Sequence, residues 1–232
     1  MNLRETRNQT NKTISMELDE IIPERDCLFG RNRFVKAYLS TANKWSIRNE
    51  RMNTLGMFVI LSQCIRDREY EYGAMGLDLR IHGMCFQGSG SGKDPLINFM
   101  MEICKRIGLK MISMSTITSA GLIGTVTPDG EPVVGPAAYA DIIAFKESSN
   151  IMHTANTTHS SDLLNLFNAI LDKNGHVEKQ LAHGTLSYDS HVSFMGTSYP
   201  SNIQINMLRT GFLPRMLITY KEIDEDFYEQ VS

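Results

Sequence analysis

Residues 79–95 read LRIHGMCFQGSGSGKDP, an apolar run that passes into a glycine-rich loop ending in Gly92-Lys93. A strand, a glycine loop, a lysine and a helix in this order are typical of a phosphate-binding P-loop. The glycines allow backbone N–H groups to converge on phosphate oxygens, and the lysine reaches the β- and γ-phosphates of a nucleotide. We therefore expect ATP to bind here. The residues expected to contact it are Gln87, Gly88, Ser89, Gly90, Ser91, Gly92, Lys93 and Asp94.

Two residues of this loop depart from the usual P-loop pattern. Gln87 stands where the first glycine is expected, and Asp94 replaces the Ser or Thr that follows the lysine. The flanking sequence supports the motif, because Pro95 suits the first turn of a helix and Gly108 suits its end. Between them, apolar side chains fall on one helical face, at Leu96, Met100, Ile103, Cys104 and Ile107. The alternative interpretation is a flexible Gly/Ser connector.

The composition is that of an ordinary globular protein. The chain has 232 residues, 42% hydrophobic and 21% charged, enough for one α/β domain with extra elements or for two small domains. No apolar stretch reaches the length of a membrane span, and residues 1–20 lack the apolar core of a secretory signal. The four cysteines show no C-x-x-C spacing, which favours buried thiols over disulfides or a zinc site. We expect a cytoplasmic protein with no membrane partner.

Charge is distributed unevenly along the chain, although its net value is only −3. Residues 25–51 contain seven Lys or Arg against two Asp or Glu, whereas residues 222–229 are acidic. A basic stripe of this kind can neutralise the backbone phosphates of DNA. A solvated helix face is the alternative, and the negative net charge argues against a surface generally coated with basic residues for nucleic acid.

Hydrophobic periodicity and turn residues predict an α/β chain. Besides the helix after the glycine loop, helices are expected at 29–44, 49–66, 115–124, 160–171 and 201–209. Strands are expected at 79–86, 109–112, 140–147, 184–187, 191–198 and 212–220, with a hairpin at 126–134 and a loop at 70–76. Together with the P-loop motif, this order of elements leads us to expect an α/β fold, a three-layer sandwich of the P-loop NTPase type. Its expected parts are a polar lead-in at 1–20, a helical N-terminal segment at 21–76 and the ATPase core at 77–232.

A P-loop ATPase also needs acidic residues that activate water and hold magnesium. The apolar strand at 142–145 runs into Lys146-Glu147, so Glu147 is predicted to activate water and to contribute to the metal site. Lys146 occupies the place of the usual Asp. Asp94 is predicted to ligate Mg²⁺ directly, because this ion prefers hard oxygen ligands and the carboxylate directly follows the lysine, in the place of the usual Ser or Thr hydroxyl. The alternatives are a surface glutamate for Glu147 and a helix N-cap for Asp94.

Three further residues are candidates for catalysis. Thr197, or its neighbour Ser198, lies at the tip of the strand predicted at 191–198 and could sense the γ-phosphate. Arg209 and Arg215 are candidates for an arginine that stabilises the transition state, either in the same subunit or across a subunit interface. Ordinary loop chemistry for Thr197 and ordinary salt bridges for the arginines are the alternatives.

The order of these elements resembles that of the additional-strand P-loop ATPases, the RecA- and AAA-like class. More narrowly, it is similar to the helicase-like ATPase domains of phage and mobile-element replication proteins, which are often partnered with primases. The resemblance is carried by residues 79–95, the segment 118–122, the strand leading to Glu147 and the segment 210–215, TGFLPR. In such families a small residue and Gly-Phe-Leu precede an arginine that begins a strand.

This resemblance implies an ATP-driven, magnesium-dependent motor of the helicase or DNA-translocase class, acting in DNA replication. It also implies a homo-oligomeric ring, single-stranded DNA as partner, a primase or another replication protein as a further partner, and the cytoplasm of the host cell as the location. Two other functions remain open. A P-loop kinase for a small molecule or nucleotide lacks support from an arginine-rich lid or an Asp-Arg acceptor motif. A nucleotide-binding assembly protein with weak or lost hydrolysis is indicated by Gln87 and Lys146.

Overall fold

The computed structural model describes residues 32–45, 49–66, 71–72, 75–76, 78–146, 148, 161–203 and 211–221. The chain divides into two compact units, residues 1–41 and 42–232. Helix α3 (Arg33–Trp45) crosses the boundary between them. The other described elements belong to the second unit.

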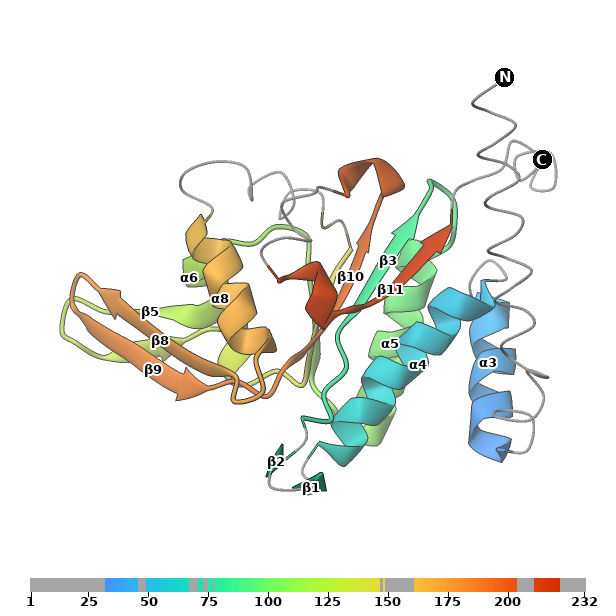
Figure 1. Cartoon of the computed structure of the whole chain (residues 1–232), viewed down its shortest axis with the longest axis horizontal. Helices are drawn as coiled ribbons and strands as arrows, with labels where there is room; N and C mark the ends of the chain where they lie inside the picture. Colours follow the sequence, from blue (N-terminus) through green and yellow to red (C-terminus); the bar gives the residue numbers. More distant parts are fainter. Residues whose placement is uncertain are drawn as a thin grey trace. The chain divides into compact units, whose positions relative to one another are not determined.

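Within the described residues, five strands form the central sheet of the second unit, in the order β11-β3-β10-β7-β4. Every neighbouring pair is parallel, and the arrows of β3 and β10 in Figure 1 point toward the same edge. The strands are β3 (Gly83–Gln87), β4 (Met111–Met114), β7 (Ile142–Phe145), β10 (Ser193–Ser198) and β11 (Leu217–Lys221). The predicted α/β class is therefore confirmed.

Helices cover both faces of this sheet and so produce three layers (Figure 1). On one face, α4 (Glu50–Ile65) packs beside α5 (Lys93–Ile107). On the other lie α6 (Ser119–Ile123) and α8 (Ser161–Leu171). Because strands covered on both faces are buried along their whole length, β3, β7 and β10 carry apolar or small side chains without alternation, except for the buried Gln87 at the end of β3.

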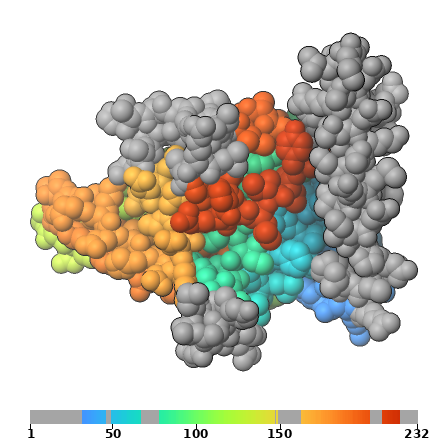
Figure 2. Space-filling model, viewed as in Figure 1, coloured from blue at the N-terminus to red at the C-terminus, as the bar shows by residue number. Residues whose placement is uncertain are grey.

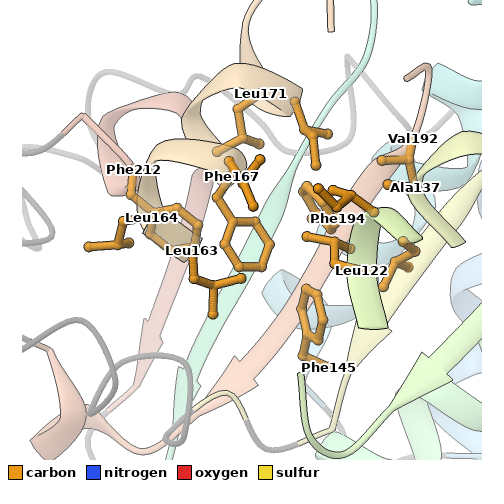
Figure 3. Close-up of a cluster of buried hydrophobic side chains, with 14 of the residues drawn as sticks. Leu122, Ala137, Phe145, Leu163, Leu164, Phe167, Leu171, Val192, Phe194 and Phe212 are labelled. Carbon is orange, nitrogen blue, oxygen red and sulfur yellow. The ribbon is translucent and has the colours of Figure 1, made fainter. Parts of the chain in front are cut away.

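Aromatic side chains hold α8 against the sheet (Figure 3). Phe167 of α8 packs edge-on against Phe145 of β7 and Phe194 of β10, with ring centroids 5.8 and 5.0 Å apart. It also contacts Phe212, at 5.4 Å. All four rings are buried, and burying each one stabilises the fold by about 1.5–3 kcal/mol. The apolar face predicted for this helix is confirmed, with buried members Leu163, Leu164, Phe167, Ile170 and Leu171.

Two hairpins project from the sheet and lie side by side (Figures 1 and 2). The first, β5 (Gly124–Val126) with β6 (Pro132–Val134), confirms the hairpin predicted at 126–134. The second joins β8 (His176–Leu181) to β9 (Gly184–Asp189). Strand β8 was not predicted, because only Val177 of its side chains is fully buried and the rest are polar or half exposed.

Helix α5 begins earlier than its sequence predicts. Its first residue is Lys93, two positions before Pro95, because Gly92 adopts a left-handed conformation (φ 84°) and serves as the N-cap. The predicted end is confirmed, since Gly108 is also left-handed (φ 81°) and caps the helix. Left-handed backbone is inexpensive only for glycine, so the two glycines delimit the helix.

Other boundaries also differ from the predictions. The loop expected at 70–76 contains the paired strands β1 (Glu71–Tyr72) and β2 (Met75–Gly76). The strand expected at 212–220 is preceded by a 3-10 turn, η3 (Leu213–Arg215), so Arg215 does not begin the strand. A 3-10 turn, η2 (Pro200–Asn202), overlaps the start of the helix expected at 201–209. Residues 204–209 of that prediction lie outside the described residues.

A buried histidine makes the stability of this fold dependent on pH. Burial, and secondarily the nearby guanidinium of Arg80, lowers the pKa of His82 to about 3. Its Nδ1 accepts a hydrogen bond from the backbone N–H of Phe194, 3.2 Å away. Between pH 6.5 and 3 the unfolded chain binds a proton that the folded chain does not. We therefore expect His82 to remove about 2 kcal/mol of stability between pH 7 and pH 5.

Urea unfolding of the parent and of His82→Phe at both pH values measures this effect. The Phe variant keeps a ring beside Phe194 but cannot titrate, so its loss of stability on acidification should be about 2 kcal/mol smaller. Exchange of an exposed histidine, His183→Asn, is the matched control. Equal pH dependence of parent and His82→Phe would contradict the assignment.

Candidate functional site

The carboxyl edge of the sheet brings the predicted site residues together. Strand β10 lies beside β3, with Ser198 opposite Phe86, and beside β7, with Gly196 opposite Phe145. Because the three strands are parallel, the residues that follow them meet at one edge. In open α/β sheets, ligands bind in the crevice outside the carboxyl ends of the strands.

The glycine loop, residues 88–92, connects β3 at this edge to the N-terminus of α5. Gly90 and Gly92 have φ angles of 73° and 84°, in the left-handed region. A Cβ at Gly90 would meet nothing within 4 Å, so the backbone conformation rather than lack of space requires glycine there. The N-cap makes no side-chain hydrogen bond to the helix, which leaves N–H donors and the positive end of the helix dipole at the loop.

The hydroxyl of Ser91, near the end of this loop, is buried. The residue is 7% exposed, and its Oγ has no hydrogen-bond partner in the described part of the chain. A buried hydroxyl without a partner costs about 1–3 kcal/mol. Such groups occur where a water, ion or ligand completes the hydrogen bonding.

Lys93, the first residue of α5, bends back toward the sheet. Its ammonium donates a hydrogen bond to the Gln87 carbonyl, 3.1 Å away, and lies 3.6 Å from the centroid of the Tyr199 ring. Lys93 is only 9% exposed. Tyr199 follows β10 directly. Sequence reasoning missed Tyr199, and its one signal was an aromatic residue just after the predicted strand tip at Thr197 and Ser198.

The glutamine that replaces the first glycine of the motif has a structural role. The Gln87 side chain is buried, and its Oε1 accepts a hydrogen bond from Nδ2 of Asn49, 3.0 Å away. Asn49 is the N-cap of α4, and its Oδ1 accepts from the N–H of Met52. Gln87 therefore ties the start of α4 to the end of β3, which a glycine could not do.

Asp94 lies in the first turn of α5 and is exposed. The N-cap of this helix is Gly92, so the alternative role of Asp94 as N-cap is wrong. Its negative charge still stabilises the N-terminal turn through the helix dipole. Its predicted role as a magnesium ligand stays a prediction. The described residues contain no group of three or more His, Cys, Asp or Glu side chains placed to hold a metal.

The residues around the end of β7 are joined to β10 and α5. Thr197 is fully buried, and its Oγ1 donates to the carbonyl of Lys146. The Oγ of Ser148 donates in turn to the Thr197 carbonyl, at 2.7 Å. The Lys146 ammonium donates to Oδ1 of Asn98 on α5, at 3.1 Å. Thr197 thus holds the chain on both sides of residue 147, while Glu147 itself lies outside the described residues.

The structure does not bring Arg215 to the glycine loop. Leu217, the first residue of β11, pairs with Gly83, the first residue of β3, so Arg215 lies near the amino edge of the sheet. Strand β3 alone, at about 3.3 Å per residue, puts roughly 13 Å between the two edges. The Arg215 guanidinium instead contacts Asp172, 3.4 Å away, and the Gly211 carbonyl. The other candidate arginine, Arg209, lies outside the described residues.

Comparisons with known proteins assign no family. The sequence matches no family model and no curated protein. None of the helices in the described ranges combines the length and apolar character needed to cross a bilayer.

Proposed function

We propose that the glycine loop binds the phosphates of Mg·ATP and that the chain is a P-loop ATPase of the helicase or DNA-translocase class. The observation that carries the proposal is the β3–loop–α5 unit at the carboxyl edge of a parallel sheet. Two left-handed glycines shape the loop, the Lys93 ammonium lies beside it, and the buried Ser91 hydroxyl has no hydrogen-bond partner among the residues that the structure describes. A flexible connector would account for none of these features.

In this proposal the protein groups divide the work of binding phosphate. Backbone N–H groups of residues 88–94 and the Ser91 hydroxyl donate hydrogen bonds to phosphate oxygens, and Lys93 turns its ammonium to the β- and γ-phosphates. Magnesium enters with the nucleotide, since proteins hold it through one or two carboxylates plus substrate phosphates. Asp94 is exposed on the first turn of α5 and suits this mode. Glu147 is the other candidate.

The strand order supports the additional-strand class. β10 lies between β3, which leads to the glycine loop, and β7, which leads to residue 147. A glutamate in this position could orient water for attack on the γ-phosphate, and Thr197 would position it by holding the carbonyl of Lys146. Arg215, at the other edge of the sheet, could act only on the nucleotide of a neighbouring subunit in a ring.

The DNA-directed part of the proposal rests on the sequence resemblance and on charge. Of the basic residues between 25 and 51, the described ones are all exposed: Arg33, Lys36, Lys44 and Arg51. Exposed lysines and arginines can neutralise DNA phosphates, which makes binding weaken with added salt. ATP turnover measured with and without single-stranded DNA tests this class. Stimulation by DNA, and a ring-sized particle when nucleotide is added, are the expected results.

Glu147→Gln is expected to reduce ATP turnover about 100-fold, at the low end of the range for loss of a general base, while leaving ATP affinity unchanged. The amide cannot accept the proton of the attacking water, yet it keeps the shape of the side chain. Glu131→Gln, in the exposed turn between β5 and β6, is the matched control. A Glu147→Gln protein that hydrolyses ATP as fast as its parent would remove Glu147 from the proposed site.

One observation favours a second candidate, a nucleotide-binding assembly protein without hydrolysis. Lys146 stands where a magnesium-positioning Asp is expected, and its ammonium is bound to Asn98 on α5. ATP binding without turnover, with or without DNA, would support this candidate. Turnover that depends on an added phosphate acceptor would instead indicate a kinase.

A further inference from the structure

We infer that Tyr199 is a positioning residue that sets the nucleotide affinity of this site, because its ring competes with phosphate oxygens for the ammonium of Lys93. The inference rests on the proposed function of the glycine loop. Tyr199 belongs to no P-loop motif in the sequence, and it reaches the loop only because β10 lies next to β3.

The ammonium of Lys93 has too few N–H donors to contact the Gln87 carbonyl, the Tyr199 ring and two phosphate oxygens at the same time. A lysine ammonium has three N–H donors. One is directed at the Gln87 carbonyl, 3.1 Å away, and the Tyr199 ring occupies a second direction with its centroid at 3.6 Å. Contact with both a β- and a γ-phosphate oxygen needs two donors. The ammonium therefore cannot keep both the Gln87 carbonyl and the Tyr199 ring when phosphates bind.

The ring is the partner that can leave. The Gln87 carbonyl belongs to the backbone of β3, in the middle of the parallel sheet, and cannot move without disturbing the ladder. Tyr199 is 37% exposed, so its side chain can rotate toward solvent. A charged phosphate oxygen is also a stronger partner for an ammonium than a ring face.

The contact is strong enough to measure, because Lys93 is almost fully buried. Cation–π contacts gain strength when the cation is removed from water. The turn after β10 is itself held in place, since Asn202 of η2 donates to Oγ of Ser198, 3.1 Å away. The ring is thereby kept over the ammonium by a fixed backbone, and the side chain alone has to move.

Calorimetric titration of Mg·ATP into Tyr199→Leu and Tyr199→Phe tests the competition. Leu keeps apolar bulk without a π-face, and its variant should bind Mg·ATP about 3- to 20-fold more tightly than the parent. Phe keeps the ring and should restore the parent affinity within about twofold. Weaker binding by the Leu variant would mean that the ring orients Lys93 toward phosphate, and this would overturn the inference. So would unchanged binding, or a Phe variant that behaves like Leu.

Acylation of Lys93 without added nucleotide separates this inference from the proposed function. An amine reagent followed by mass spectrometry should label Lys93 faster in Tyr199→Leu than in the parent or in Tyr199→Phe. The exposed Lys105 provides an internal reference for reagent strength. Equal labelling rates in all three proteins would overturn the ring contact. Failure of the parent to bind ATP, with the expected labelling pattern intact, would instead overturn the proposed nucleotide site.

Discussion

Lys93→Ala is expected to lower kcat/KM for ATP about 1,000-fold, the combined effect of losing two charge-assisted contacts of about 2 kcal/mol each. The lysine is the cation beside the glycine loop at the first position of α5, and its low exposure means that water would screen it little. Charge builds up on the phosphates during transfer, so part of the loss should appear in kcat as well as in affinity. Steady-state turnover and calorimetric titration with Mg·ATP measure the two parts.

The matched control is Lys105→Ala, an exposed lysine in the last turn of the same helix. It should bind and turn over ATP like the parent. Because Lys93→Ala also removes the hydrogen bond to the Gln87 carbonyl, thermal unfolding should accompany the assays. A folded Lys93→Ala protein with the parent's affinity for Mg·ATP would contradict the glycine loop as the phosphate site. Loss of binding would support the site in an ATPase and in a kinase alike.

Arg80→Met is expected to lower the free energy of unfolding by about 3 kcal/mol. The Arg80 side chain is 4% exposed and pairs with Asp78, with the closest atoms 2.7 Å apart. Its guanidinium also donates to the backbone carbonyls of Ile170, Asp172 and Ser190, at 3.1, 2.6 and 2.9 Å.

These contacts explain the large effect expected for Arg80. The Ile170 carbonyl lies in the last turn of α8 and has no further helical turn to bond to. The Asp172 carbonyl follows the helix and also accepts a hydrogen bond from the backbone N–H of Gly175, 2.8 Å away. The side chain of Arg80, which precedes β3, therefore caps α8 and joins it to the segment before β10. Methionine keeps the apolar stem but leaves these carbonyls and Asp78 without the guanidinium. Loss of one partner from a buried group of this kind is costly because the other groups stay desolvated.

Urea unfolding of Arg80→Met and Arg106→Met compares the free energy of unfolding lost with a buried and with an exposed arginine. Arg106 pairs with Glu102 one helical turn away, but its side chain is 72% exposed, so its loss should cost less than about 0.5 kcal/mol. Arg80→Lys should recover only part of the stability, because an ammonium cannot reproduce the planar fork of donors. Similar midpoints for Arg80→Met and Arg106→Met would contradict the capping role.

The elements that sequence reasoning predicted well are those with strong local signals. Gly108 ends α5 as expected, and Pro128-Asp129-Gly130 lies in the turn between β5 and β6, within the predicted hairpin. In each case the residues involved are within four positions of one another. Their backbone preferences act in the unfolded chain as well as in the folded one.

The candidate site was only partly predictable. The glycine loop and its lysine were found from their spacing, and their roles remain proposals. The partners of these residues could not be inferred, because they are 38 to 106 residues away in the chain. Lys93 contacts Tyr199, the Gln87 side chain contacts Asn49, and Thr197 contacts the backbone of Lys146. Arg215 was a candidate for action either in the same subunit or across a subunit interface, and the parallel pairing of β11 with β3 puts it at the edge of the sheet opposite the loop.

Local sequence is enough to specify the strand–glycine loop–helix unit, because its glycines, its lysine and the apolar face of its helix lie close together in the chain. The residues that surround this unit follow from the folded sheet and not from the local sequence. The order β11-β3-β10-β7-β4 sets Tyr199 over Lys93 and Thr197 against Lys146, and it carries Arg215 away from the loop. Strand order depends on the packing of the whole sheet, because residues that contact one another across strands share no local sequence pattern.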